Sequence, residues 1–227
     1  MEKGKSYESD ALIGVLAKEK PYLSAKTHYW TLRTLVRTGQ LVKLRRGLYS
    51  LPSEHAKSAC QFSLTPEATA IAKLISKKFP FVQFNVFETV MMNEFLNHLI
   101  AQNTIFIQVE KNSSAYVFRF LHEKGKKVMY KPNLQDFHRY WSKGCIIVLD
   151  RISEAPSQKG KSPAVTLEGM LVDMLADRLL GSTYEKAEYA SVLAQARENY
   201  LLDERRMLRY ARRRNKENEI REYLQNA

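Results

Sequence analysis

Short apolar runs alternate with amphipathic segments through the middle of this chain, and this alternation limits the fold more than any other feature. Helical patterns begin at Thr65, a good N-cap followed by Pro66, and recur between the runs, including residues 91–100. Because strands that alternate with helices usually form one layered sheet, we expect a mixed α/β domain over residues 63–152. We expect strands in the apolar runs at residues 81–87, 104–110, 127–130 and 145–150.

The residues after this domain have mainly helical patterns. Residues 152–163 are polar and contain proline and glycine, so we expect a linker there. Helices are expected in the rest of a C-terminal region that spans residues 153–227. The remaining residues, 1–62, are expected to form a separate N-terminal domain.

Composition excludes several classes of protein. The chain has 227 residues, of which 44% are hydrophobic and 26% charged, as in folded globular proteins. No run of about 18 apolar residues occurs, and the first residues lack the apolar core of a signal peptide, so we expect a cytoplasmic protein that does not enter a membrane. Cys60 and Cys145 are the two cysteines, without CxxC spacing, so neither a disulfide framework nor a cysteine zinc site is expected.

Positive charge is concentrated near the N-terminus. The whole chain has a formal charge of +12, and residues 1–63 contribute +6 of it, from eleven lysines and arginines against five acids. No acidic residue occurs between Lys20 and Ser53. An acid-free basic stretch in a protein of otherwise mixed charge is typical of a contact with a polyanion.

This basic stretch has the pattern of a winged helix-turn-helix domain. Residues 9–18 fit a short helix, and a second helix fits between the N-cap Ser24 and Gly39. Residues 42–51 then alternate as two short strands, with Gly47 at the position of a tight turn. In such domains the second of these helices enters the major groove of DNA and the hairpin contacts the backbone. The overall expectation is therefore an α+β fold with an N-terminal winged helix-turn-helix, a central mixed α/β domain and C-terminal helices.

One face of the second helix carries hydroxyls and cations without a carboxylate. Helical spacing places Ala25, Tyr29, Leu32 and Val36 toward the core and the remaining polar side chains outward. We expect the threonines and arginines of this outward face to read base edges or adjacent phosphates, Trp30 to pack against a sugar or a thymine methyl, and the hairpin cations to hold the backbone. The predicted DNA-binding residues are Lys26, Thr27, Trp30, Thr31, Arg33, Thr34, Arg37, Lys43, Arg45 and Arg46.

The same segment resembles the N-terminal winged helix of the AbiEi-like antitoxins, which are transcriptional regulators of type IV toxin–antitoxin systems. The matching pieces are Gly39-Gln40-Leu41, Lys43 and Arg46-Gly47-Leu48-Tyr49. A weaker similarity lies in the helix from Thr166, where Glu168, Leu171, Val172 and Asp173 keep the family spacing and Leu167 replaces its usual proline. The resemblance implies a repressor that binds the operator of its own operon and counters a nucleotidyltransferase-type toxin, which would be its protein partner.

Motifs for catalysis are missing from the sequence. It contains no GxSxG, GxGxxG or GxxxxGK[ST] pattern, and its histidines lack the spacing of metal ligands. We therefore expect a protein that is not an enzyme and that needs no cofactor or metal. Two alternatives stay open: a module that uses the winged helix to dock a protein, and a metal-dependent nuclease that uses Glu110, Lys111 and Asp150.

Two further patterns also allow two interpretations. The arginines of residues 205–214 could extend a path for DNA or grip an acidic partner, although a solvated helix with i,i+4 ion pairs is favoured. Aromatic residues could line a ligand pocket, although core packing at helical spacing is favoured for Phe118, Phe120, Phe137, Tyr140 and Trp141.

Overall fold

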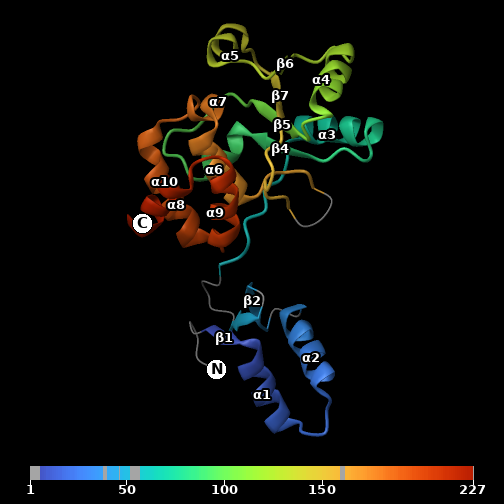
Figure 1. Ribbon diagram of the computed structural model, residues 1–227, viewed down its shortest axis with the longest axis vertical. Coiled ribbons are helices and arrows are strands. Elements are labelled where there is room, and N and C mark those ends of the chain that lie inside the picture. The colour runs from blue at the N-terminus through green and yellow to red at the C-terminus, as the bar shows by residue number, and fades with distance from the viewer. Residues whose placement is uncertain (1–5, 38–39, 46, 52–56, 159–161, 227) are drawn as a thin grey trace. The chain divides into compact units, whose positions relative to one another are not determined.

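The chain forms two compact units, residues 1–58 and residues 59–227. The computed structural model describes residues 6–37, 40–45, 47–51, 57–158 and 162–226, with the side chains of Ala25, Arg37 and Arg45 left out. The regular structure of the described residues consists of helices and two small sheets. After the last strand of the second sheet, the described residues form helices and their connections (Figure 1). The expectation of a mixed α+β protein with C-terminal helices is therefore confirmed.

The first unit contains two helices and a three-stranded antiparallel sheet. Its elements follow the order β1 (Ser6–Glu8), α1 (Ser9–Glu19), α2 (Ala25–Arg37), β2 (Val42–Arg45) and β3 (Leu48–Ser50). The strands lie in the order β1-β3-β2, so β3 pairs with both neighbours. Both helices and both hairpin strands match the sequence-based expectation, whereas β1 was not expected, because three residues are too few to show a periodic pattern.

The core of the first unit differs in one respect from the predicted helical stripe. Leu12 of α1, Leu32 of α2 and Tyr49 of β3 are buried together. On α2, however, His28 is buried and Tyr29 is 48% exposed. The expected core position of Tyr29 was therefore wrong, because the side of α2 that carries His28 and Leu32 is the buried one.

The second unit is built on a four-stranded mixed sheet. Its strands are β4 (Phe84–Glu88), β5 (Ile105–Val109), β6 (Val128–Tyr130) and β7 (Ile146–Asp150). The last three lie inside predicted runs, and β4 extends one residue past its run. They lie in the order β4-β5-β7-β6, with β4 antiparallel to β5 and the other pairs parallel. After β5 the chain passes through α4 (Ser114–Glu123) to the edge strand β6. It then passes through α5 (Leu134–Tyr140) to β7, which lies between β5 and β6.

Helices cover both faces of this sheet (Figure 1). On one face, Ile105 and Ile107 pack against α3 (Pro66–Lys78) and α4. On the other face, Phe106 and Ile147 belong to the core that includes the C-terminal helices. Successive side chains of a strand point to opposite faces, so two apolar faces explain why these strands are mainly apolar.

The C-terminal helices belong to the same compact unit as the sheet. They are α6 (Leu167–Ala176), α7 (Arg178–Gly181), α8 (Tyr189–Asn199), α9 (Glu204–Arg213) and α10 (Glu217–Asn226), with a short 3-10 helix η2 (Lys186–Glu188) before α8. Helix α6 is almost entirely buried, and its N-cap Thr166 accepts a hydrogen bond from the Gly169 backbone.

Two predicted segments differ from the structure. The expected helix over residues 91–100 was wrong, because a 3-10 helix η1 spans Thr89–Glu94 and no regular helix continues to residue 100. The expected linker over residues 152–163 also differs where it is described, because Ala155 is buried and the Pro163 carbonyl accepts from the Val86 backbone at 2.7 Å. Directly after this segment, Ala164 forms an isolated bridge with Val86 of the edge strand β4.

Among the described residues, no helix is both long enough and apolar enough to cross a membrane.

Candidate nucleic-acid interface

A cavity of about 480 Å³ in the first unit brings two predicted DNA-binding cations onto one surface. Arg33 reaches it from α2 and Lys43 from β2. The residues that line it are Ser9, Tyr29, Arg33, Val36, Lys43, Gly47 and Tyr49. Helix, hairpin and the start of α1 therefore meet around a single concave surface.

Local structure explains how these side chains are positioned. The Ser24 hydroxyl accepts a hydrogen bond from the Thr27 backbone at 3.3 Å, which caps the start of α2. In the sheet, Lys43 lies directly opposite Tyr49. The Ser9 backbone donates to the Gly47 carbonyl at 2.7 Å, which ties the start of α1 to the hairpin.

The cavity is cationic and hydroxylated. No carboxylate is among its lining residues, which include two cations and the hydroxyls of Ser9, Tyr29 and Tyr49. The Tyr29 hydroxyl donates a long hydrogen bond, 3.5 Å, to the carboxylate of Asp10, which is not a lining residue. Cations and hydroxyl donors are the groups that contact phosphate oxygens in protein–DNA complexes.

The other predicted residues of α2 whose side chains are described are not among the residues that line this cavity. Lys26 is exposed and Trp30 is 62% exposed, so both are accessible. Thr31 and Thr34 are partly buried, and their hydroxyls donate to the carbonyls of Thr27 and Trp30 at 3.0 and 3.1 Å. Because these protons are used within the helix, the oxygens of the two threonines can accept from a ligand more readily than their hydroxyls can donate to one.

The hydroxyl of Thr27, near the start of α2, also has a hydrogen-bond partner within the chain. The Thr27 hydroxyl lies 2.9 Å from the Ser24 hydroxyl, and either atom can donate. The side chains of Arg37 and Arg45 and the whole of Arg46 lie outside the described residues. Their predicted contacts with DNA stay predictions from the sequence.

The three hydroxyl-bearing residues of the cavity were missed by the sequence analysis. Tyr29 was assigned to the core, Ser9 was interpreted as a helix start, and Tyr49 was seen as part of the hairpin. A sequence signal existed for Tyr29 alone, since it is adjacent to Trp30 and four residues before Arg33. Ser9 and Tyr49 are brought in by the sheet pairing, which local patterns do not reveal.

The residues of the nuclease alternative meet at one edge of the second sheet. Val109 and Asp150 are register partners at the ends of β5 and β7, so Glu110 and Lys111 follow directly beside Asp150. Ser114 and Lys131 donate to the two oxygens of Asp150, at 2.5 and 2.7 Å. Partial burial opposes ionisation, but these two hydrogen bonds hold the pKa of the Asp150 carboxyl below its usual value.

This edge has the chemistry of an internal ion pair. Both oxygens of Asp150 already accept from the chain, and Glu110 accepts from Ser113 at 3.3 Å. Among the described residues, no group of three or more His, Cys, Asp or Glu side chains could hold a metal ion together.

The arginine-rich C-terminal segment is partly buried. Arg214 is 15% exposed and lies 3.3 Å from the Asp173 carboxylate and 3.5 Å from that of Asp177. Arg206 and Arg213 donate to the backbone of Ser157 and the hydroxyl of Ser153. Within residues 205–214, Arg212 fits the favoured picture of a solvated helix, since it is exposed and pairs with Glu217. The picture was wrong for Arg214, which is largely buried and joins the end of α9 to α6.

Family membership follows from a comparison with protein-family models. Residues 27–227, most of the chain, match the model described as a family of unknown function, DUF6577. The match begins inside α2 and covers the hairpin and the whole second unit. No curated protein matches the chain. The chain therefore belongs to the DUF6577 family of unknown function.

Proposed function

We propose that this protein is a DNA-binding transcriptional regulator whose first unit is a winged helix-turn-helix. Helix α1, helix α2 and the β2-β3 hairpin follow one another in the order of that domain, with β1 completing the sheet. In this arrangement α2 enters the major groove and the hairpin contacts the backbone.

The observation that carries the proposal is the cavity shared by α2 and the hairpin. It places Arg33 and Lys43 on one surface with three hydroxyl groups and no lining carboxylate. A phosphate of duplex DNA is the ligand that suits this chemistry, because it pairs with both cations and can accept from the Ser9 hydroxyl. Trp30 and Lys26, exposed on the neighbouring part of α2, would then lie toward the groove.

A narrower role rests on the resemblance to AbiEi-like antitoxins. Under this proposal the DNA is the operator of the protein's own operon, and the protein counters a nucleotidyltransferase-type toxin. The resemblance covers the α2-hairpin segment best, and it supports DNA binding more strongly than the antitoxin role. An adjacent reading frame for a nucleotidyltransferase-like protein would support the antitoxin role directly.

DNA binding is tested by measuring the affinity of the full chain for its own upstream duplex at several salt concentrations. In Arg33→Ala plus Lys43→Ala we expect weaker binding and a salt slope reduced by roughly two, about one for each lost phosphate contact. The matched control is Lys73→Ala plus Lys77→Ala, which removes the same charge from exposed positions of α3 in the second unit. Fluorescence anisotropy with a labelled duplex measures both quantities.

Two results would contradict the proposal. One is an equal loss in the control variant, which would mean that binding reflects net charge alone. The other is an unchanged slope in Arg33→Ala plus Lys43→Ala. A module that docks a protein through the first unit would show no salt-dependent affinity for DNA, and the two substitutions would not change its DNA affinity. Its elution in size-exclusion chromatography would instead shift when a toxin-like neighbour is added.

A further inference from the structure

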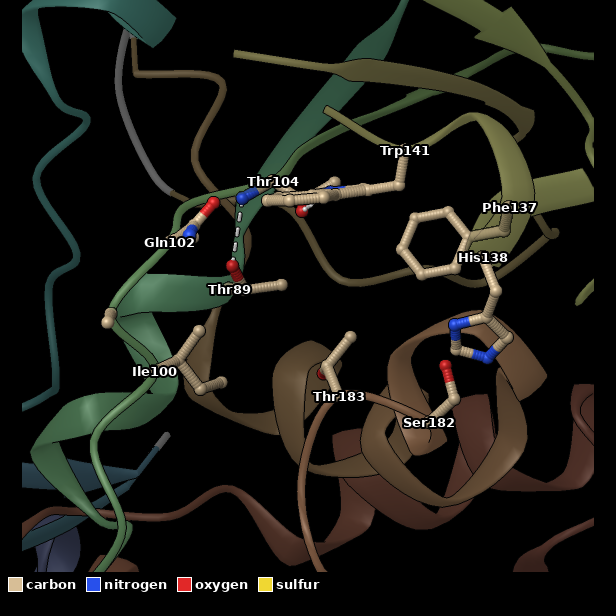
Figure 2. A pocket seen from close by; sticks show the side chains of 10 residues that line it. Thr89, Ile100, Gln102, Thr104, Phe137, His138, Trp141, Ser182 and Thr183 are labelled. Carbon is tan, nitrogen blue, oxygen red and sulfur yellow. Dashed lines mark hydrogen bonds between the residues drawn. The ribbon is translucent and has the colours of Figure 1, made fainter. Parts of the chain in front are cut away.

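A second cavity, of about 390 Å³, lies within the second unit at the starting ends of β5 and β7. Four separated segments line it: the start of η1 at Thr89, the end of the loop before β5, helix α5 with Trp141, and the turn after α7 (Figure 2). Its size falls within the range of small-molecule sites in proteins. It does not include the residues of the proposed DNA-binding surface.

The apolar walls of the cavity are two rings and an aliphatic side chain. In Figure 2 the indole of Trp141 forms one side, Phe137 adjoins it, and Ile100 faces the space from the side of the β5 loop. The Trp141 indole N–H donates to the Thr104 hydroxyl at 2.7 Å. This bond holds the ring by its edge, and Figure 2 shows one face of the ring turned toward the cavity.

Polar groups on the remaining walls are free to contact a ligand. The side chains of Gln102 and His138 are exposed, and neither has a hydrogen-bond partner among the described residues. Ser182 and Thr183 each donate to a carbonyl of α7 at 2.7 Å, which leaves their oxygens as acceptors. The cavity therefore offers both donors and acceptors around an aromatic wall.

The lining carries no fixed charge. None of the residues that line the cavity is an aspartate, glutamate, lysine or arginine. A phosphate or carboxylate would lose hydration there without gaining a cation, so an ionised ligand is disfavoured. A flat, neutral ring with donors and acceptors on its edge matches both the aromatic wall and the uncharged polar groups.

We propose that this cavity binds a free nucleoside, with its base stacked on the exposed face of Trp141. The Gln102 amide and the His138 imidazole contact the donors and acceptors of the base edge. Ser182 and Thr183 accept from the base or the sugar hydroxyls. This site is independent of the proposed DNA-binding function, since none of its residues belongs to the first unit.

The test is isothermal titration calorimetry of the full chain with adenosine, guanosine, cytidine and uridine, and with their 5′-monophosphates. We expect saturable binding of at least one nucleoside and weaker binding of its monophosphate. Trp141→Ala should weaken binding by about tenfold or more, which is the usual loss when a base–aromatic stack is removed. The control is Tyr116→Ala, which removes an aromatic side chain that is 62% exposed on α4 and should leave the affinity unchanged.

Gln102→Ala plus His138→Ala provides a second variant that alters exposed side chains only, in case Trp141→Ala does not fold. We expect this variant to bind several-fold more weakly than the unmodified chain, with an unchanged melting temperature. The proposal is overturned if no nucleoside binds saturably, if the monophosphate binds more tightly than the nucleoside, or if a folded variant of either kind keeps full affinity.

Discussion

Single residues show where backbone geometry limits substitution in the first unit. Gly47 precedes β3 with a φ of 80°, a conformation that residues with a Cβ adopt at a cost. A Cβ at this position would meet only the Ser9 hydroxyl, at 3.7 Å, so space is not the constraint. Gly14 lies inside α1, where a Cβ would meet nothing within 4 Å.

Alanine at these two glycines is therefore expected to change stability in opposite directions. Gly47→Ala should destabilise the first unit by about 1–2 kcal/mol, because it forces a left-handed conformation on alanine. Gly14→Ala should stabilise the same unit by about 0.5–1 kcal/mol, since alanine favours the helix and restricts the unfolded chain. Urea unfolding followed by Trp30 fluorescence, in a Trp141→Phe background, measures both. A stabilising Gly47→Ala would show that the turn differs from the one described.

At the scale of elements, a buried polar network joins the second sheet to the C-terminal helices. Asp173 of α6 is fully buried and accepts from Gln108 of β5 and from Tyr210 of α9, both at 2.7 Å. Burial raises the pKa of the Asp173 carboxyl, and the charge of Arg214 and the two hydrogen bonds oppose this rise. Strand β5 and helices α6 and α9 thus meet at one carboxylate.

Removing that carboxylate should be among the most costly substitutions in the second unit. Asp173→Ala leaves Arg214 buried without its main partner, so we expect a loss of about 3–5 kcal/mol in the free energy of unfolding. The control is Arg209→Ala, whose pair with Glu154 is exposed at the surface and should contribute less than about 1 kcal/mol. Chemical denaturation of the full chain compares the two, and similar losses would mean that Asp173 is not a structural centre.

At the scale of the whole molecule, the two compact units differ in the size of their cores. The core of the first unit contains the buried apolar residues Leu12, Leu32, Leu41 and Tyr49. The second unit has a large core on each face of its sheet, and one of them extends through the C-terminal helices. Small domains bury a smaller fraction of their surface and are correspondingly less stable.

We therefore expect two separate unfolding transitions, with the first unit melting at the lower temperature. Differential scanning calorimetry of the full chain measures both. A fragment of residues 59–227 should keep the upper transition and lose the lower one. A single cooperative transition, or a fragment that fails to fold, would show that the units depend on each other for stability.

Much of the secondary structure was predictable because its signals are local. Each strand of the second sheet overlaps a predicted run, and only β4 extends past its run, by one residue, because a strand buried on both faces is mainly apolar. The same reasoning wrongly predicted a helix over residues 91–100. Met92, Phe95 and Leu96 are apolar because they pack into the core shared with the C-terminal helices, and the chain there forms a single 3-10 helix.

The candidate sites were predictable only in part. Arg33 and Lys43 were predicted as DNA contacts from charge and helical spacing, and the structure brings them to one cavity. For the second cavity, Phe137 and Trp141 were considered as ligand residues, but core packing was favoured. Phe137 is both buried in the core and part of the cavity wall. Gln102, His138 and Thr183 carry no local signal, because they meet only through the fold.

The sequence by itself determined most of the helices and strands and the acid-free basic stretch of α2 and the hairpin, because these depend on neighbours a few residues apart. Only the tertiary structure decided the insertion of β7 between β5 and β6, the burial of Asp173 with Arg214, and the membership of both cavities. The physical reason is distance along the chain. Pairing partners, buried ion pairs and cavity walls come from segments tens of residues apart, and their contact depends on which apolar faces pack together.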